Sequence, residues 1–236
     1  MKKLMISLTS HLQLVNLLSF LVLAGTALSV QAADSILRIE NSMIPLTAND
    51  WSVAYTGYGF VNFGSQNQFV RFAPQASVAS HETHAGLLLA KKHLKTPIKN
   101  FRVSVTVTTE KQLRTPKPNA WECFWLFFNY ASDLHGKKVT NYFTLKPNGI
   151  ELGHAYEELG QDFLATAAQP RLVIGAKNKI VIENKNGLLK AWVNDVQVLT
   201  FNSEQAKYPL YSNSGTIGLY SEDSQVKVES VDIVKL

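Results

Sequence analysis

The amino-acid sequence predicts an all-β fold, a two-sheet antiparallel β-sandwich or jelly roll. Three observations lead to this prediction. Short runs rich in β-branched and aromatic residues, bounded by turn residues, recur at regular spacing from residue 51 onward. No stretch longer than about ten residues shows helical periodicity together with capping residues. Hydrophobic residues make up 46% of the chain and charged residues 17%, which is enough apolar material for a core and argues against disorder. About a dozen such strands close as one sandwich.

The first 32 residues are expected to be a secretory signal peptide rather than part of the fold. Lys2 and Lys3 form a positive start, the segment 12–30 is apolar and uncharged, and Val30-Gln31-Ala32 fits a signal peptidase site. The short two-lysine start is typical of bacterial signals. The alternative is a membrane anchor, which polar interruptions such as Asn16 and Gly25 disfavour. We therefore expect an exported protein, periplasmic or secreted, without stable membrane insertion, and a single domain over residues 33–236.

The strands expected in the first half of the domain include two with informative patterns. In the segment 100–109, Phe101, Val103, Val105 and Val107 alternate with polar residues, which is typical of a strand with one buried face. The segment 121–130 is apolar on both faces, as a central strand is. The expected strands are Trp51–Thr56, Phe60–Phe63, Phe69–Phe72, Gly86–Ala90, Asn100–Thr109 and Trp121–Tyr130.

The second half is predicted to contain a meander with recognisable turns. Asn186-Gly187 is a strong hairpin signal because both residues tolerate positive φ, and Asn194-Asp195 forms the next turn. Single helical turns are expected within 156–164 and 203–207. The expected strands are Asn141–Leu145, Ile150–His154, Arg171–Ile174, Lys179–Glu183, Leu188–Val193, Val196–Phe201, Thr216–Tyr220 and Val226–Val234.

Composition excludes several classes of function. There are 23 Lys+Arg against 18 Asp+Glu, without a dense basic run, so we expect no nucleic-acid partner. The single cysteine, Cys123, excludes an internal disulfide and a multi-thiolate zinc site. We expect it to be a buried, inert thiol. A histidine-based zinc site is also not expected, because only His81 and His84 lie close together in the sequence.

Alternation places one set of polar and aromatic side chains on the outer face of a sheet. Tyr142 and Lys146 share a face of their strand, and Glu151 falls on the same side of the next strand. A shallow cleft with aromatic rings and polar groups suits sugars, whose C–H faces stack on rings and whose hydroxyls need donors and acceptors. The alternative is that these aromatic residues fill the core. The ligand-binding candidates are His84, Arg114, Asn119, Trp121, Trp125, Tyr142, Lys146 and Asn148.

Several segments carry a resemblance to a known fold family. They are Glu82-Thr83-His84, the stretch from Lys111 to Glu122, the stretch from Tyr142 to Gly153, Gln161-Asp162-Phe163-Leu164-Ala165-Thr166 and Gly218-Leu219-Tyr220-Ser221-Glu222-Asp223. The chain resembles, over about residues 40–236, the concanavalin-A-like lectin/glucanase sandwiches, near the 3-keto-disaccharide hydrolase (family 16 glycosidase-like) domains. The resemblance implies the fold and carbohydrate recognition.

The resemblance also implies a structural calcium ion between the first and last strands. Asp232 matches the position of the carboxylate of the final strand, and Glu40 is the amino-terminal partner. Calcium prefers hard oxygen ligands such as these. The alternative is that Asp232 faces solvent beside a lysine.

Whether the chain is an enzyme stays open at this stage. Retaining glycosidases need two carboxyl groups about 5–5.5 Å apart, and Glu122 and Glu151 could converge from neighbouring strands as acid and base. Glu122, inside Trp-Glu-Cys-Phe-Trp, could equally be a solvated residue at a strand end. The Glu-x-Asp-x-Glu pattern of family 16 glucanases is missing, and no Gly-x-Ser-x-Gly elbow for a serine hydrolase is present.

The sequence therefore predicts an exported, carbohydrate-recognising, lectin-like sandwich that acts on an oligo- or polysaccharide outside the cytoplasm. Two alternatives remain: a glycoside-cleaving enzyme of the 3-keto-disaccharide hydrolase type, and a structural or adhesive surface protein. A convergent carboxyl pair in a deep pocket would favour the enzyme, and a groove of aromatic rings the lectin. A cleft filled by Phe124 and Phe128 would favour the structural protein.

Overall fold

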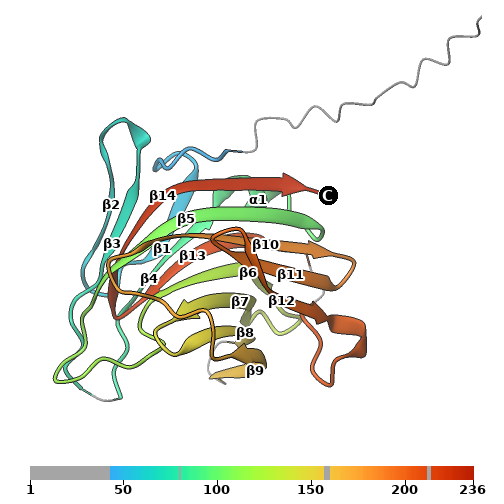
Figure 1. Cartoon of the computed structure of the whole chain (residues 1–236). Coiled ribbons are helices and arrows are strands. Elements are labelled where there is room, and N and C mark those ends of the chain that lie inside the picture. The colour runs from blue at the N-terminus through green and yellow to red at the C-terminus, as the bar shows by residue number, and fades with distance from the viewer. Residues whose placement is uncertain (1–42, 80, 157–159, 212–213) are drawn as a thin grey trace, which may run out of the picture. The chain divides into compact units, whose positions relative to one another are not determined.

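The computed structural model describes residues 43–79, 81–156, 160–211 and 214–236. They form two seven-stranded antiparallel sheets that face each other (Figure 1), which confirms the predicted sandwich. The expected signal peptide at 1–32 lies outside the described residues. Within the part of the chain that is described, no helix is long and apolar enough to span a membrane.

Sheet 1 has the strand order β1-β4-β13-β6-β7-β8-β9. The apolar strand β6 is its fourth and central member, as the two-sided apolar pattern predicted. The strands of sheet 1 are β1 (Trp51–Tyr55), β4 (Ala85–Ala90), β6 (Phe124–Ser132), β7 (Lys138–Lys146), β8 (Gly149–Tyr156), β9 (Gly160–Ala167) and β13 (Thr216–Glu222).

Sheet 2 has the strand order β12-β11-β10-β5-β14-β3-β2. Its two longest strands, β5 and β14, lie side by side at its centre (Figure 1). The strands are β2 (Phe60–Phe63), β3 (Val70–Ala73), β5 (Phe101–Gln112), β10 (Lys177–Lys185), β11 (Leu188–Val193), β12 (Val196–Asn202) and β14 (Ser224–Lys235).

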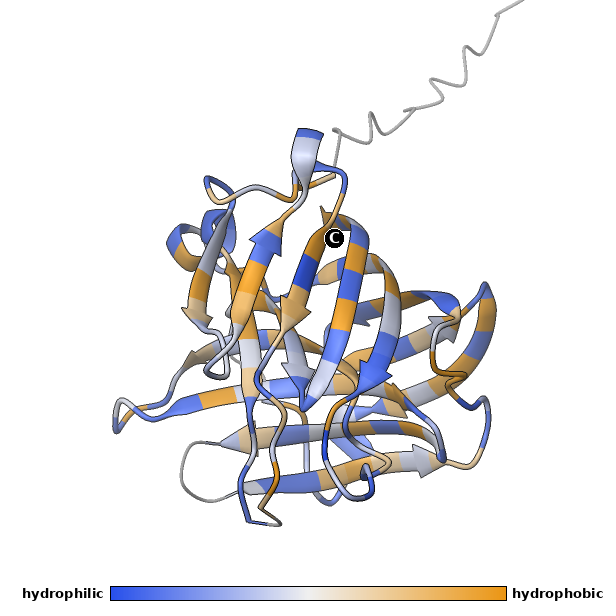
Figure 2. Cartoon of the chain, turned by 90° about the vertical axis from the view of Figure 1, so that its left-hand side faces the viewer, coloured by the Kyte–Doolittle hydropathy of each residue, from blue (hydrophilic) through white to orange (hydrophobic). Residues whose placement is uncertain are grey.

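The core fills the space between the sheets. Side chains alternate between buried and more exposed along β5, β11 and β14 of sheet 2, and Figure 2 shows strands with bands of opposite hydropathy. The strands β4, β6, β7 and β8 of sheet 1 are buried along most of their length. Phe101, Val103, Val105 and Val107 of β5 are all buried, as predicted. The ring of Phe101 packs against that of Phe128 of β6 with centroids 5.8 Å apart, which shows that Phe128 points toward sheet 2.

The turns predicted from the sequence are present. Asn186 and Gly187 have φ values of 51° and 80° and join β10 to β11. Asn194 and Asp195, with φ values of 51° and 66°, join β11 to β12. Positive φ at these residues matches the twist that a two-residue hairpin needs.

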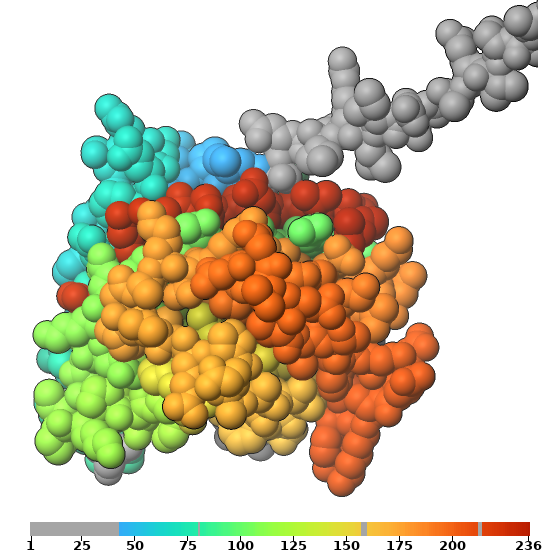
Figure 3. Space-filling view, viewed as in Figure 1, coloured from blue at the N-terminus to red at the C-terminus, as the bar shows by residue number. Residues whose placement is uncertain are grey.

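The amino-terminal end of the described chain meets the last strand. Met43 forms an antiparallel bridge with Asp232, and the amide of Ile44 donates to the carbonyl of Val231 at 2.9 Å. Figure 3 shows the segment that follows residue 43, in blue, lying against β14, in red. The amino-terminal end of the described chain is therefore hydrogen-bonded to the last strand, β14.

The structure departs from the predicted elements at three places. The residues 160–164, expected within a helical turn over 156–164, belong to the edge strand β9, and all 8 residues of β9 are at least partly exposed, so it lacks an apolar pattern. The residues 171–174, expected as a strand, form a loop and turn. A short helix, α1 (Lys91–Lys95), follows β4 and was not predicted. The 3₁₀ turn Ser203–Gln205 agrees with the turn expected there.

Candidate functional site

The face of sheet 1 that points away from sheet 2 carries an open hollow of about 310 Å³. This is within the range of ligand pockets, which begins near 300 Å³. We call it the central hollow. Its residues come from six strands of sheet 1: Tyr55, Trp125, Phe127, Tyr130, Lys138, Val139, Thr140, Ala155, Tyr156, Gln161, Tyr220 and Glu222.

Strand alternation explains why aromatic rings gather there. On β6, Phe128 points into the core, so Trp125 and Phe127 point outward. Tyr220 of β13 pairs in register with Trp125, which places both on the same outer face. The rings of Phe127 and Tyr220 stack at 4.7 Å with planes 15° apart. Trp125 contacts Tyr220 edge-on at 5.8 Å. Together these three rings form an aromatic floor.

The rim of the central hollow is more polar than its floor. Tyr55, on the edge strand β1, is 45% exposed, and Gln161 is exposed on β9. Lys138 is exposed and donates a 2.7 Å hydrogen bond to the Ser132 hydroxyl. Among the described residues that line the hollow, Glu222 provides the only carboxyl group.

Glu222 is a partly buried carboxyl group in an aromatic setting. Burial raises its pKa to about 7, and the nearby charges of Asp223 and Glu122 act in the same direction. The Tyr220 hydroxyl donates to Glu222 at 3.1 Å, which opposes that shift. Near neutral pH, Glu222 can therefore both donate and accept hydrogen bonds, because its protonated and ionised forms coexist.

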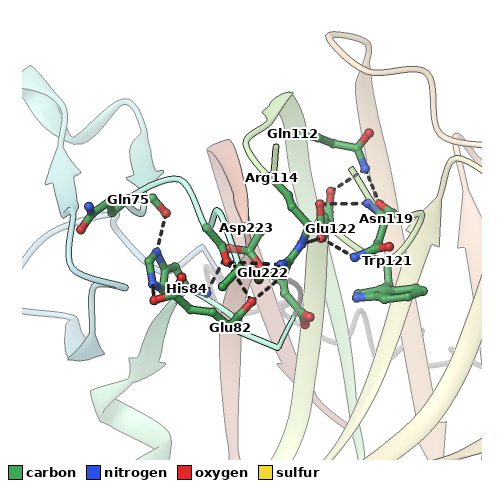
Figure 4. A network of polar contacts seen from close by, with 12 residues as sticks. Gln75, Glu82, His84, Gln112, Arg114, Asn119, Trp121, Glu122, Glu222 and Asp223 are labelled. Atoms are coloured by element: carbon green, nitrogen blue, oxygen red, sulfur yellow. Dashed lines mark hydrogen bonds and ion pairs between the residues drawn. The ribbon is translucent and has the colours of Figure 1, made fainter. Parts of the chain in front are cut away.

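A second group of predicted residues meets at one end of the sandwich, in a network around Arg114 (Figure 4). The guanidinium of Arg114 pairs with Glu122, and its Nη2 donates to Asp223 Oδ2 at 2.7 Å. Asn119 donates to Glu122 from its backbone at 3.0 Å and from its side chain at 2.8 Å. The backbone amide of His84 donates to Asp223 at 3.0 Å.

This network is built to hold loops in place. Arg114 also donates to the carbonyls of Ala79 at 2.7 Å and Glu82 at 2.6 Å, which ties the segment before β4 to the loop after β5. Glu122 and Asp223 have no exposed surface. A buried arginine whose donors are taken by carboxylates and carbonyls has no free edge for a ligand.

Glu122 is therefore neither the solvated strand-end residue nor the cleft residue that the sequence allowed. It does not line the central hollow and does not converge with Glu151. His84 is 5% exposed, with its Nδ1 2.9 Å from the carbonyl of Gln75. The packing of this end of the sandwich, rather than chemistry on a substrate, accounts for the contacts of Glu122.

A third group forms on the outer face of sheet 1, where Tyr142, Lys146 and Glu151 meet as alternation predicted. The Tyr142 hydroxyl donates to Glu151 at 2.7 Å, and Lys146 pairs with the other carboxylate oxygen. The ring of Tyr142 lies against Trp125, with centroids 4.5 Å apart. The Tyr142 hydroxyl also packs against Gly153. A Cβ atom at residue 153 would lie 2.3 Å from the hydroxyl oxygen of Tyr142.

The sequence suggested that Tyr142 and Trp125 both contact the ligand, whereas the structure gives them different positions relative to the central hollow. Tyr142 has no exposed surface, so it supports the floor and positions Glu151 without offering a face to a ligand. Trp125 is 3% exposed but lines the central hollow. The pKa of Tyr142 is raised by several causes, of which burial is the largest, and the adjoining Glu151 raises it further. Tyr142 therefore stays a protonated donor.

The remaining candidates are dispersed. Trp121 is 45% exposed and lies beside the Arg114 network, not at the central hollow (Figure 4). Asn148 is exposed in the turn between β7 and β8. Cys123 is fully buried, and burial raises its thiol pKa to about 12, which agrees with the inert thiol expected.

The described residues contain no group of three or more His, Cys, Asp or Glu side chains able to hold a metal ion. Asp232 is partly buried and has a polar or electrostatic partner, and Glu40 lies outside the described residues. The described part of the expected calcium site thus supplies one carboxylate.

Sequence reasoning missed Tyr55, Phe127, Tyr220 and Glu222. The expected strand 216–220 stops two residues short, whereas β13 continues to Glu222. Continuing the alternation by one more pair would have placed Tyr220 and Glu222 on one face. Their position beside Trp125 depends on cross-strand register, which the sequence does not specify.

Comparison with known proteins identifies the fold but no close relative. No family model and no curated protein sequence matches the chain. Among solved structures, the carbohydrate binding module CBM66 from Bacillus subtilis superimposes with a TM-score of 0.55 at 12% identity, covering 80% of this chain and 99% of that one.

Two further structures share the architecture. The exoplasmic/lumenal domain of VIP36, in a Ca²⁺/mannose-bound form, gives a TM-score of 0.54 at 13% identity, covering 84% of this chain and 91% of that one. A glycoside hydrolase family 16 endo-glucanase from Bacteroides ovatus gives 0.51 at 10% identity, covering 80% and 96%. The chain thus has the lectin/glucanase sandwich fold that its sequence resembles, a fold that serves both binding and hydrolysis in these proteins. At such identities the likeness establishes the fold alone.

Proposed function

We propose that this protein is an exported carbohydrate-binding protein that holds a glycan against the outer face of sheet 1. The observation that carries the proposal is the central hollow, with an aromatic floor and a polar rim on an open sheet face. Sugar rings present an apolar C–H face and a polar edge, and this surface matches both. Binding at this face is supported by the fold shared with CBM66 and VIP36, whose names describe carbohydrate binding or a mannose complex.

The structural or adhesive alternative required a cleft filled by Phe124 and Phe128. Both residues are buried within the core cluster, and Phe128 faces sheet 2. They leave the outer face of sheet 1 open, which favours the lectin-like function.

Glycoside cleavage is the second candidate, and Glu222 is the observation that favours it. A carboxyl group with a pKa of about 7 in an aromatic hollow has the protonation expected of a general acid. Hydrolysis of a glycoside normally requires a second carboxyl group, and the described lining of the hollow supplies none. Binding without cleavage is therefore the leading function.

The proposal includes a structural calcium ion held by Asp232 and Glu40. The Met43–Asp232 bridge supports it, because it brings the chain to β14 three residues after Glu40 in the sequence. Calcium appears in the name of the VIP36 structure. Export rests on the signal-like residues 1–32, and amino-terminal sequencing of the protein recovered from the periplasm or medium tests it.

A glycan array with purified residues 33–236, run with and without calcium, tests the proposed function. The Tyr55→Ala variant should retain glycans more weakly than the wild type, whereas Tyr208→Ala, a similarly exposed tyrosine that lies outside the central hollow, should retain them as the wild type does. Retained glycans are then incubated further and analysed for cleavage. Products that form with the wild type and not with Glu222→Gln would establish the enzyme. A folded protein that retains no glycan would contradict both carbohydrate functions.

A further inference from the structure

A second hollow adjoins the central one. It has a volume of about 650 Å³ and lies at the edge of sheet 1, beside β1. Tyr55 lines both hollows, so its ring stands at their junction. We call this second one the edge hollow. Its lining residues are Val53, Ala54, Tyr55, Thr56, Gly57, Tyr58, Thr83 and Ala85.

The edge hollow extends around the edge strand β1 and meets the central hollow on the outer face of sheet 1. Ala85 of β4 pairs in register with Glu222 of β13, and Tyr55 of β1 pairs with Leu87 of β4. Residues paired in this way point to the same side of a sheet. Ala85, Tyr55 and Glu222 therefore share the outer face with the aromatic floor.

Together the hollows cross the whole width of sheet 1. Each of its seven strands contributes a lining residue, from Tyr55 of β1 and Ala85 of β4 to Gln161 of β9. Neighbouring strands lie about 4.8 Å apart, so a path over seven strands is about 29 Å long. A single sugar ring would occupy only a small part of such a path.

The surface along this path is aromatic and nearly uncharged. Tyr58 is 82% exposed at the edge hollow and Tyr55 is 45% exposed at the junction, ahead of the floor formed by Trp125, Phe127 and Tyr220. The described residues that line the two hollows include one carboxyl group, Glu222, and one ammonium group, Lys138, and the edge hollow contributes neither. Tyr58 and Tyr55 offer exposed stacking positions, and Trp125 and Phe127, 3% and 6% exposed, form an apolar base beside them.

We infer that the ligand of this face is a neutral, linear glycan chain, bound over several consecutive sugars across sheet 1, with Tyr55 contacting the chain between the central and edge hollows. This inference rests on the proposed function and makes it more specific. It predicts that affinity increases with the length of the glycan, because each further sugar covers more of the aromatic path. It also disfavours polyuronates, since the described lining has no cluster of cationic side chains to neutralise them.

Isothermal titration calorimetry with chains of two to six sugars tests the inference. The probes are neutral β-1,3-gluco-, β-1,4-gluco- and N-acetylchito-oligosaccharides, with oligogalacturonates as the acidic series. For the neutral series that binds, affinity should rise at least tenfold from the dimer to the hexamer. The acidic series should bind more weakly at every length.

Variants at the two ends locate the path. Tyr55→Ala and Tyr58→Ala, at the β1 side, and Gln161→Ala, at the β9 side, should lower hexamer affinity severalfold while changing dimer affinity less. The matched controls are Tyr208→Ala and Gln197→Ala, exposed residues that do not line either hollow. Thermal unfolding of each variant verifies that the fold is intact.

The outcomes separate this inference from the proposed function. Equal affinity for dimer and hexamer would overturn the chain-length inference and leave carbohydrate binding standing. Tighter binding of the acidic series would overturn the preference for neutral chains. Failure of every series to bind a folded protein would contradict the proposed function, and the inference with it.

Discussion

Glu222 and Asp223 are adjacent in the sequence, yet their carboxyl groups serve different parts of the molecule. Asp223 accepts a 2.7 Å hydrogen bond from buried Arg114, whereas Glu222 lines the central hollow and accepts a hydrogen bond from Tyr220. The change of direction occurs where β13 ends, and Asp223 has a φ of 39° there. One residue completes the packing of the sandwich, and the other is available for a ligand.

We predict that the stability of the protein falls as the pH rises from about 4.5 to about 7, because of Glu222. Its pKa is raised from 4.5 to about 7 in the folded state, so the folded state retains the proton more strongly than the unfolded chain. The stabilisation is complete below about pH 4.5 and is lost as the pH rises toward 7, amounting to up to about 3 kcal/mol. Urea unfolding of the wild type and of Glu222→Gln between pH 5 and 8 measures it. Parallel curves for the two proteins would contradict this prediction.

We predict that Arg114→Met strongly destabilises the fold, by about 3–5 kcal/mol. The substitution leaves the buried carboxylates of Glu122 and Asp223 without their cation. Arg102→Met is the control, because Arg102 is half-exposed and lies 3.9 Å from Glu183. Denaturant unfolding should show little change for the control. A loss below about 1 kcal/mol for Arg114→Met, as for a surface pair, would refute the structural role of the network.

We predict that Tyr142→Phe lowers stability by about 1.5–3 kcal/mol, since a hydrogen bond to a charged group is lost. The ring remains to pack against Trp125, so only the 2.7 Å contact with Glu151 is removed. Because Tyr142 has no exposed surface, glycan affinity should stay within twofold of the wild type. A large loss of affinity at unchanged stability would show that Tyr142 contacts the ligand after all.

We predict that Cys123 does not react with thiol reagents in the folded protein. The thiol is fully buried, burial raises its pKa to about 12, and its sulfur lies 3.2 Å from the Thr144 hydroxyl. Titration with a coloured aromatic disulfide should release no chromophore until denaturant is added, and one equivalent thereafter. Rapid labelling of the native protein would mean that the outer face opens around β6.

We predict that calcium stabilises the protein. If Asp232 and Glu40 hold the ion, added calcium should raise the melting temperature and a chelator should lower it. Asp232→Asn should abolish the difference, whereas Asp195→Asn, on an exposed hairpin turn, should preserve it. Equal melting temperatures with calcium and with chelator would eliminate the site.

The fold could be predicted from the sequence wherever one physical pattern dominates. Alternation over 100–109 is clear because one face of β5 is buried by the other sheet, and Asn186-Gly187 specifies its turn through positive φ. The edge strand β9 has little buried surface, so its sequence carries no such pattern. The loop at 171–174 is apolar enough to resemble a strand, although Val173 is 67% exposed.

The site was only partly predictable for a related reason. The grouping of Tyr142, Lys146 and Glu151 follows from alternation on two strands joined by a short turn. The pairing of Arg114 with Asp223 joins residues 109 positions apart, and only the assembled sheets determine it. The same is true of Tyr55 and Glu222 at the central hollow.

The strand order has a consequence for how the protein is made. Strand β13 lies between β4 and β6 in one sheet, and β14 lies between β3 and β5 in the other. Until these two strands have been synthesised, each sheet is divided into two separate halves with exposed strand edges. Stable folding therefore has to wait for nearly the whole polypeptide, and long-range pairing of this kind forms slowly. A nascent chain would remain open to chaperones throughout translation, and a chain truncated before residue 216 would have no completed sheet.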